Sequence, residues 1–181
     1  MSTARKFSTA YTVENYRLWE GDWELIAGIA VSMSPSPFGP HERAVNGLSY
    51  SFRHQLKELD ASCEVYAGLD WIVADDTVVR PDLMIVCGEQ PEKHLERAPA
   101  LVAEVLSPSM RQLDLTTKRD IYQQAGVEHY LIVDLEARTI EHVHFDNKEK
   151  PVPQVIGPGE TLTLTVANQY QVTLAGDSVA G

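Results

Sequence analysis

Short apolar runs separated by polar connections dominate the middle of the chain. Leu83–Cys87 and residues 100–106 are rich in Val, Ile and Leu, which is typical of buried strands. Between residues 113 and 125 the apolar positions follow the helical period, and Gly126 is a stop signal. Residues 130–134 form another short apolar run. The order strand, strand, helix, strand predicts an α/β layer with a mixed sheet.

The flanking segments predict one long helix and several further strands. Residues 41–60 carry an apolar face at helical spacing, which predicts the longest helix. Residues 12–20 predict a short helix, and residues 23–27 and 29–33 a hairpin around Gly28. Further strands are expected at residues 62–69, 70–74, 139–145 (an exposed edge), 160–166 and 170–174, with 151–158 a loop or an edge strand. Polar, mobile ends are expected at residues 1–8 and 176–181, and a rigid non-helical connection at residues 34–40.

Two acidic residues accompany the central apolar runs. Asp82 immediately precedes the first run, and Glu104 interrupts the second. If the two strands pair as a hairpin, the start of one lies beside the end of the other, and the two carboxylates meet at one edge of the sheet. A carboxylate in an apolar strand stays charged only if it is paired or binds a cation. Glu104 alone could face solvent or pair with an arginine, but the two acids together favour a site for Mg²⁺, which prefers oxygen ligands.

Other polar residues are candidates for the same site. Asp114, Lys118 and Tyr122 are spaced four apart and share one helix face. This spacing fits either a solvated ion pair worth about 0.3–0.5 kcal/mol or a Lys118 that turns toward the acidic pair. Glu24 alternates with apolar residues on its strand, and a solvent-facing role is as well supported as a site role. His41 and Glu42 lie in the first turn of the long helix, where capping and a helix-dipole contact are the alternatives.

Histidines and cysteines add less to the picture. His142 and His144 fall on the same strand face, but no acid or cysteine completes a metal site in sequence, so solvent exposure is expected. Cys63 and Cys87 lie in apolar contexts and are expected to be reduced core residues of a cytoplasmic protein.

Length and composition limit the number of domains and the classes of binding partner. The 181 residues suffice for one domain, and the 44% hydrophobic content is ordinary for a globular protein. No apolar run approaches the roughly 20 residues of a membrane helix, so no membrane partner is expected. The formal net charge of −11 opposes general attraction to nucleic acid. Clustered basic residues could still form a local basic face, with candidates at Arg43, Arg53, His54, Lys57, Arg111, Lys118 and Arg119.

Several of these stretches carry a resemblance to a known family. The matching pieces are RPDLMIV, EVLSPSMRQLD, the helix with Lys118, AGVEHYLIVD and, upstream, WELIAGIAVSMSPSP followed by His41. The chain resembles the PD-(D/E)XK nuclease superfamily and, within it, the Uma-type family of putative restriction endonucleases, over roughly residues 11–145. The resemblance implies a single restriction-endonuclease-like domain over residues 1–181, with a mixed β-sheet flanked by helices, extra hairpin strands at both ends, and a β extension at residues 146–175.

The resemblance also implies roles for individual residues. Asp82, Glu104 and the backbone carbonyl of Val105 would hold Mg²⁺ or Mn²⁺, and Lys118 would act on the reacting water or phosphate. The position two after Glu104 is Leu106, where the superfamily pattern has lysine, so the helix supplies the lysine instead. Accessory roles would fall to Glu24, His41, Glu42 and Tyr122.

These features support an endonuclease acting on nucleic acid, with DNA as the first expectation. One alternative is an inactive nuclease fold that serves as a binding or regulatory module, which the acidic charge and Leu106 favour. A metal-free acidic interaction domain has only the charge in its support. Cleavage of both strands of a duplex generally requires two active sites, so a homodimer is expected.

Overall fold

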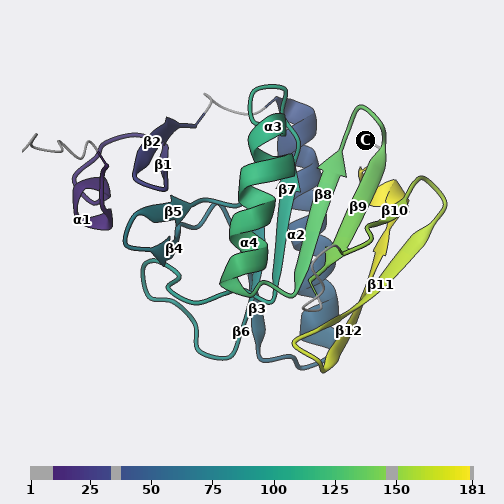
Figure 1. Ribbon diagram of the computed structural model, residues 1–181. Coiled ribbons are helices and arrows are strands. Elements are labelled where there is room, and N and C mark those ends of the chain that lie inside the picture. The colour runs from purple at the N-terminus through teal and green to yellow at the C-terminus, as the bar shows by residue number, and fades with distance from the viewer. Residues whose placement is uncertain (1–9, 34–37, 146–150, 180–181) are drawn as a thin grey trace, which may run out of the picture.

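A six-stranded mixed sheet forms the centre of the computed structural model, which describes residues 10–33, 38–145 and 151–179 (Figure 1). The strand order is β10-β9-β8-β7-β6-β3. All neighbouring pairs are antiparallel except β7 and β8, which are parallel. The strands are β3 (Cys63–Ala67), β6 (Leu83–Cys87), β7 (Leu101–Val105), β8 (His129–Asp134), β9 (Thr139–His144) and β10 (Gln154–Ile156). The mixed α/β fold predicted from the sequence is therefore confirmed.

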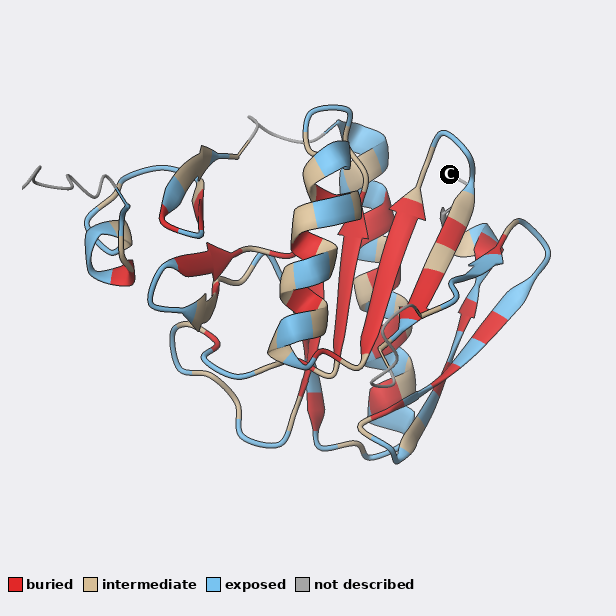
Figure 2. Cartoon of the chain, viewed as in Figure 1, coloured by how far each residue is buried: buried red, intermediate tan, exposed pale blue. Residues whose placement is uncertain are grey.

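Helices cover both faces of this sheet. Helix α2 (Gly39–Glu58) packs on one face through residues such as Leu48 and Phe52, together with the hairpin β11 (Thr161–Val166) and β12 (Tyr170–Ala175). Helix α4 (Arg119–Ala125) covers the other face, where Tyr122 packs against Tyr130. The central strands β7 and β8 are buried on both sides (Figure 2), which explains why they read as continuous apolar runs.

A second, four-stranded sheet lies beside the first, with the order β2-β1-β5-β4. Its strands are β1 (Trp23–Ile26), β2 (Ile29–Ser32), β4 (Trp71–Ala74) and β5 (Thr77–Val79), and the short helix α1 (Val13–Tyr16) packs against it. Ala27 and Gly28 both have positive φ, as a tight two-residue hairpin turn requires. The predicted hairpin is therefore present, whereas the predicted helix over residues 12–20 is much shorter.

The helix predicted at residues 113–125 begins earlier and contains a widened turn. It comprises α3 (Arg111–Leu113), a π-helical turn η1 (Asp114–Lys118) and α4, and it ends at Gly126 in the left-handed conformation. Such π turns occur frequently at functional sites. Here the turn carries two buried charged residues, Asp114 and Lys118.

The C-terminal strands differ from the prediction in one respect. Residues 139–145 were expected to form an exposed edge, but β9 lies inside the sheet between β8 and β10, and the edge is β10. Ile140, His142 and Val143 are consequently buried, so the expected exposure of His142 is wrong. The chain closes with a 3₁₀ turn, η2 (Gly176–Val179). The predictions for residues 1–8, for most of the connection at 34–40 and for the last two residues lie outside the described ranges.

Cys63 and Cys87 are joined by a disulfide, contrary to the expectation of reduced thiols. They are directly opposed on the antiparallel strands β3 and β6, which places their side chains on the same face at bonding distance. Because disulfides are rare in cytosolic proteins, the pair gives no support to the cytoplasmic location, which stays a prediction. Within the described ranges, no helix combines the length and the apolar character needed to cross a membrane.

Candidate active site

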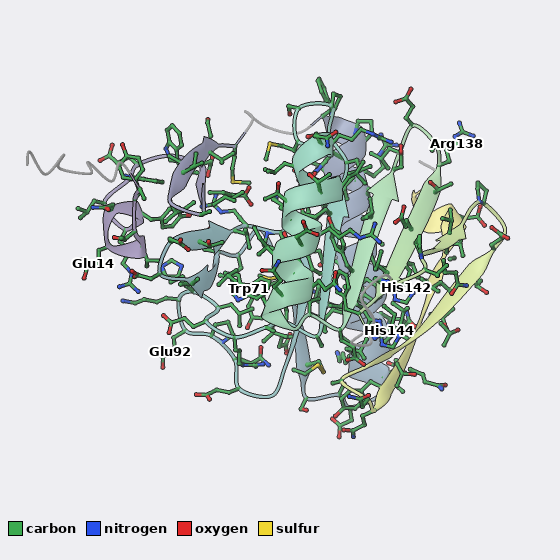
Figure 3. The ribbon with its side chains drawn as sticks, in the orientation of Figure 1. Glu14, Trp71, Glu92, Arg138, His142 and His144 are labelled. Carbon is green, nitrogen blue, oxygen red and sulfur yellow. A yellow bond between two sulfur atoms is a disulfide. The ribbon has the colours of Figure 1, made fainter. Side chains whose placement is uncertain are left out.

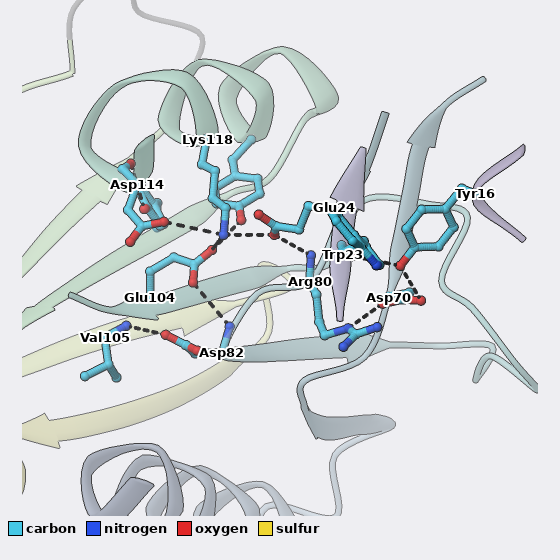
Figure 4. Close-up of polar contacts among 12 residues, drawn as sticks. Tyr16, Trp23, Glu24, Asp70, Arg80, Asp82, Glu104, Val105, Asp114 and Lys118 are labelled. Atoms are coloured by element: carbon cyan, nitrogen blue, oxygen red, sulfur yellow. Dashed lines mark hydrogen bonds and ion pairs between the residues drawn. The ribbon is translucent and has the colours of Figure 1, made fainter. Parts of the chain in front are cut away.

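The hairpin of β6 and β7 brings Asp82 and Glu104 together through reciprocal backbone contacts. The amide of Asp82 donates to Glu104 Oε2 at 3.3 Å, and the amide of Val105 donates to Asp82 Oδ2 at 2.8 Å (Figure 4). Each carboxylate is thus held by a peptide group beside the other. The strand register, in which Leu83 faces Ala103, produces this pairing at one end of the sheet.

Lys118 extends from the π turn into a group of three carboxylates. Its Nζ lies 2.9 Å from Glu24 Oε1, 3.1 Å from Glu104 Oε1 and 3.4 Å from Asp114 Oδ1 (Figure 4). Glu24 reaches this point from β1 of the other sheet, and the amide of Arg80 also donates to its Oε1 at 2.8 Å. All four charged side chains are almost completely buried, so the solvated ion pair is excluded as the role of Lys118.

Burial and neighbouring charges shift the pKa values of the residues around Lys118. Burial raises the pKa of Glu104 well above its usual value, although the charge of Lys118 opposes the shift. The Lys118 pKa is raised because the attraction of the surrounding carboxylates outweighs its burial. Tyr122 donates to Glu104 Oε1 at 2.5 Å, and burial raises the pKa of its hydroxyl, which therefore stays protonated as a donor. The cluster contains more carboxylates than cations, which favours an additional positive charge.

His41, in the first turn of α2, contacts Asp82. Its Nε2 lies 3.2 Å from Asp82 Oδ2, and the ring also hydrogen-bonds to the Val105 backbone. Burial opposes protonation of the ring, but the hydrogen bond and the charge of Asp82 leave the His41 pKa raised. Glu42, one residue further along α2, is exposed and does not line the site cavity.

A small cavity of about 100 Å³ opens beside these residues, and its lining includes His41, Asp82, Glu104, Val105, Asp114 and Lys118. Its possible metal ligands are mainly oxygen atoms. Glu24, which contacts Lys118 but does not line the cavity, has a buried Oε2 without a hydrogen-bond partner among the described residues. Hard divalent cations such as Mg²⁺ or Mn²⁺ prefer such carboxylate and carbonyl oxygens and retain several waters. The residues present therefore fit a divalent cation held by Asp82, Glu104 and the Val105 carbonyl.

The structure brings most of the predicted site residues to one place and adds others. Asp82, Glu104, Lys118, Val105, Glu24, His41 and Tyr122 lie together, whereas Glu42 does not. The buried position of Asp114 in the same cluster was not predicted, although its spacing from Lys118 was the available signal. Asp70, which immediately precedes β4, accepts hydrogen bonds from Tyr16 and from the Arg80 side chain.

Several of the candidates for a local basic face are paired with acidic side chains or with the backbone. Lys118 is buried in the cluster, Arg111 pairs with Asp134 at 2.7 Å, and Arg119 pairs with Glu141 at 3.4 Å. Arg53 donates to the Val65 carbonyl of β3. The other candidates, Arg43, His54 and Lys57, are exposed on α2.

Asp114 should make the stability of the metal-free protein depend on pH. Burial raises its pKa to about 6, with Lys118 opposing the shift. A raised pKa in the folded state contributes stability that is present below the unfolded value of about 3.9 and is lost as pH rises through 6. Relative to Asp114→Asn, the wild type should therefore lose on the order of 2 kcal/mol between pH 4 and pH 7, measured by urea unfolding.

Asp120→Asn is the matched control, because Asp120 is exposed on the same helix. The difference in unfolding free energy between this variant and the wild type should stay nearly constant over the same pH range. A constant difference for Asp114→Asn as well would show that Asp114 does not titrate as its burial requires.

Comparison with known proteins identifies the fold and the family of this chain. A similar solved structure is the crystal structure of a putative nuclease belonging to DUF820 from Anabaena variabilis ATCC 29413, with a TM-score of 0.73 and 16% sequence identity, covering 92% of this chain and 94% of that one. This likeness shows that the chain has the fold of that protein. No functionally curated protein has significant sequence similarity to the chain.

The family model for Uma2, described as putative restriction endonuclease, matches residues 13–175. The chain belongs to this family, which confirms the resemblance noted in its sequence. The match extends through the C-terminal hairpin β11–β12 and therefore covers more of the chain than residues 11–145.

Proposed function

We propose that the protein is a metal-dependent endonuclease that hydrolyses phosphodiester bonds in nucleic acid, with DNA as the first substrate to test. The observation that carries the proposal is the pairing of Asp82 and Glu104 at one end of the mixed sheet with Lys118 buried beside them. Membership in a family of putative restriction endonucleases supports the same reaction class.

The metal would be Mg²⁺ or Mn²⁺, held by Asp82, Glu104 and the carbonyl of Val105. When bound, such an ion polarises a phosphate oxygen and lowers the pKa of a coordinated water. The chain's own contribution is to fix the two carboxylates: the amides of Val105 and Asp82 orient them, and Tyr122 holds Glu104 from the helix side.

Lys118 would stabilise negative charge that develops on the reacting phosphate, or orient the attacking water. Its pKa is raised, so it serves as a permanent cation and not as a proton acceptor. Its carboxylate partners fix its position in advance, which is how buried charges contribute to electrostatic catalysis. His41 contacts Asp82 from α2 and would position that carboxylate.

The test is incubation of plasmid, linear duplex and single-stranded DNA, and of RNA, with the wild-type protein and Mg²⁺, Mn²⁺ or EDTA. We expect cleavage that requires the metal and begins within closed circular DNA, as an endonuclease predicts. Metal binding by calorimetry without cleavage of any nucleic acid would instead favour a binding or regulatory module, which the net charge of −11 and Leu106 also favour.

A homodimer is the expected assembly of such an enzyme, because two sites allow both strands to be cut. Strand β10 is the short edge of the six-stranded sheet, and Val155 on it is 54% exposed, so this edge offers a surface for pairing. Light scattering at micromolar concentration should give twice the chain mass. Val155→Lys should shift the protein toward monomer; a wild type that is already monomeric would contradict the prediction.

A further inference from the structure

Three histidines gather at the end of the sheet away from the candidate active site. His129 begins β8 and lies directly opposite His144 at the end of β9, while His142 is one diagonal position away. Figure 3 shows His142 and His144 on the side of β9 that faces the hairpin β11–β12. The three side chains share the sheet face that packs against this hairpin, because they lie at even spacing with Leu131 and Ile140 of the same core.

Glu128 adds a carboxylate to this group. One ligand atom each from Glu128, His129 and His144 lie within 4.8 Å of one another. Glu128 Oε1 is 3.6 Å from His129 Nε2, and the rings of His129 and His144 are stacked with centroids 4.8 Å apart. The sequence pattern around His144 contains no such acid, because Glu128 lies immediately before the neighbouring strand β8.

The surroundings hold the His129 ring in place. His129 Nδ1 lies 3.0 Å from His142 Nε2, and His129 Nε2 lies 3.1 Å from the Thr165 carbonyl oxygen of β11. Without metal, Nε2 must carry the proton, because a carbonyl can only accept. If Nε2 faces a cation instead, the proton moves to Nδ1, which then donates to His142. A histidine that binds a metal through one ring nitrogen generally donates a hydrogen bond from the N–H of the other, and this contact fixes the orientation of the ring.

We propose that Glu128, His129 and His144 bind a transition-metal ion of the zinc class, at a structural site separate from the candidate active site. Two imidazoles and a carboxylate suit Zn²⁺, whereas Mg²⁺ prefers oxygen ligands. Solvent or the Thr165 carbonyl can complete the coordination, since His144 is exposed.

The two sites lie at opposite ends of the same strands. In the parallel pair of β7 and β8, His129 is beside Leu101, whereas Ile132 is beside Glu104. Three residues of strand separate the two levels by roughly 10 Å, at about 3.3 Å per residue. An ion at the histidine site would join the start of β8 to the end of β9 beneath β11, and it would not contact the carboxylates around Lys118.

The experiment is calorimetric titration of the untagged, metal-stripped full-length protein with Zn²⁺ in the presence of excess Mg²⁺. Wild type should bind one equivalent, and Co²⁺ in its place should give the visible absorption of a site with nitrogen ligands. His144→Ala and Glu128→Gln should each weaken Zn²⁺ binding at least about tenfold. Both side chains are at least partly exposed, so the apo-protein melting temperature should change little.

Two variants serve as matched controls. His54→Ala removes an exposed histidine on α2, and Asp82→Asn alters the candidate active site; neither should change Zn²⁺ affinity. A wild type that binds no Zn²⁺, or an unchanged affinity in His144→Ala, would overturn the proposal. So would a loss of Zn²⁺ binding in Asp82→Asn, because it would place the ion among the carboxylates.

Discussion

Asp82→Asn should abolish metal-dependent cleavage while leaving the fold intact. Asparagine keeps an oxygen that can accept from the Val105 amide and from His41, but it removes the charge that a divalent cation requires. The expected loss of cleavage is about 10³-fold or more, which corresponds to several kcal/mol of transition-state stabilisation. Metal affinity by calorimetry should fall in parallel, and the melting temperature without metal should be unchanged or higher, since neighbouring carboxylates repel each other.

Glu42→Gln is the matched control for this variant. It also removes one carboxylate near His41, but Glu42 is exposed and outside the cavity, so cleavage should stay within about twofold of wild type, the scatter expected for a surface change. Full activity in Asp82→Asn would remove Asp82 from the metal site.

Glu104→Gln should also abolish cleavage, but with a loss of stability that Asp82→Asn does not show. Glu104 uses Oε1 to accept from Tyr122 and to pair with Lys118, and Oε2 to accept from the Asp82 amide. The amide nitrogen of glutamine must face one of these donors, and an unmatched buried donor costs about 1–3 kcal/mol. The two charge-removing substitutions are therefore not equivalent, and Asp82→Asn is the cleaner test of chemistry.

Lys118→Met should lower the free energy of unfolding strongly and should also stop cleavage. The substitution leaves Glu24, Glu104 and Asp114 buried without their shared cation, and breaking a buried ion pair in this way costs about 3–5 kcal/mol. The three carboxylates of the variant repel one another unless they bind protons or a cation. The stability of the variant should therefore rise as pH falls. Added Mn²⁺ should raise its melting temperature by more than that of wild type.

Lys57→Met is the control, since Lys57 is exposed near the end of α2, and its unfolding free energy by urea should stay within about 0.5 kcal/mol of wild type. A Lys118→Met protein as stable as wild type would show that the carboxylates around Lys118 are already protonated. The role that the family resemblance implies for Lys118 concerns cleavage only, and its burial among three carboxylates adds the expected loss of stability.

Local patterns were enough to predict the pairing of Asp82 with Glu104. Asp82 immediately precedes β6 and Glu104 lies in β7, and the pairing of strands that are consecutive in sequence follows from the apolar runs. The helical spacing predicted that Lys118 and Tyr122 share one helix face. The π turn changes this spacing little, and both side chains contact Glu104. The family resemblance added the roles of these residues, which remain proposals.

Long-range contacts account for what sequence patterns missed. Glu24 alternates on its strand in a way that fits either face, and only the placement of the N-terminal sheet decides that it is buried. Residues 139–145 looked like an edge because their true neighbour, β10, is only three residues long. The disulfide was missed because the antiparallel pairing of β3 with β6, which opposes the two cysteines, was not predicted.

The ion group around Lys118 has a consequence for how the protein is made. Glu24 and Lys118 are in contact, yet 94 positions separate them along the chain, since 118 − 24 = 94. A ribosome that has released only the first hundred residues has supplied Glu24 and Asp82 but neither Glu104 nor Lys118. The nascent polypeptide therefore cannot assemble the candidate active site until residue 118 has been synthesised. For the endonuclease proposed above, truncated chains that end before Lys118 would therefore be unable to cleave nucleic acid.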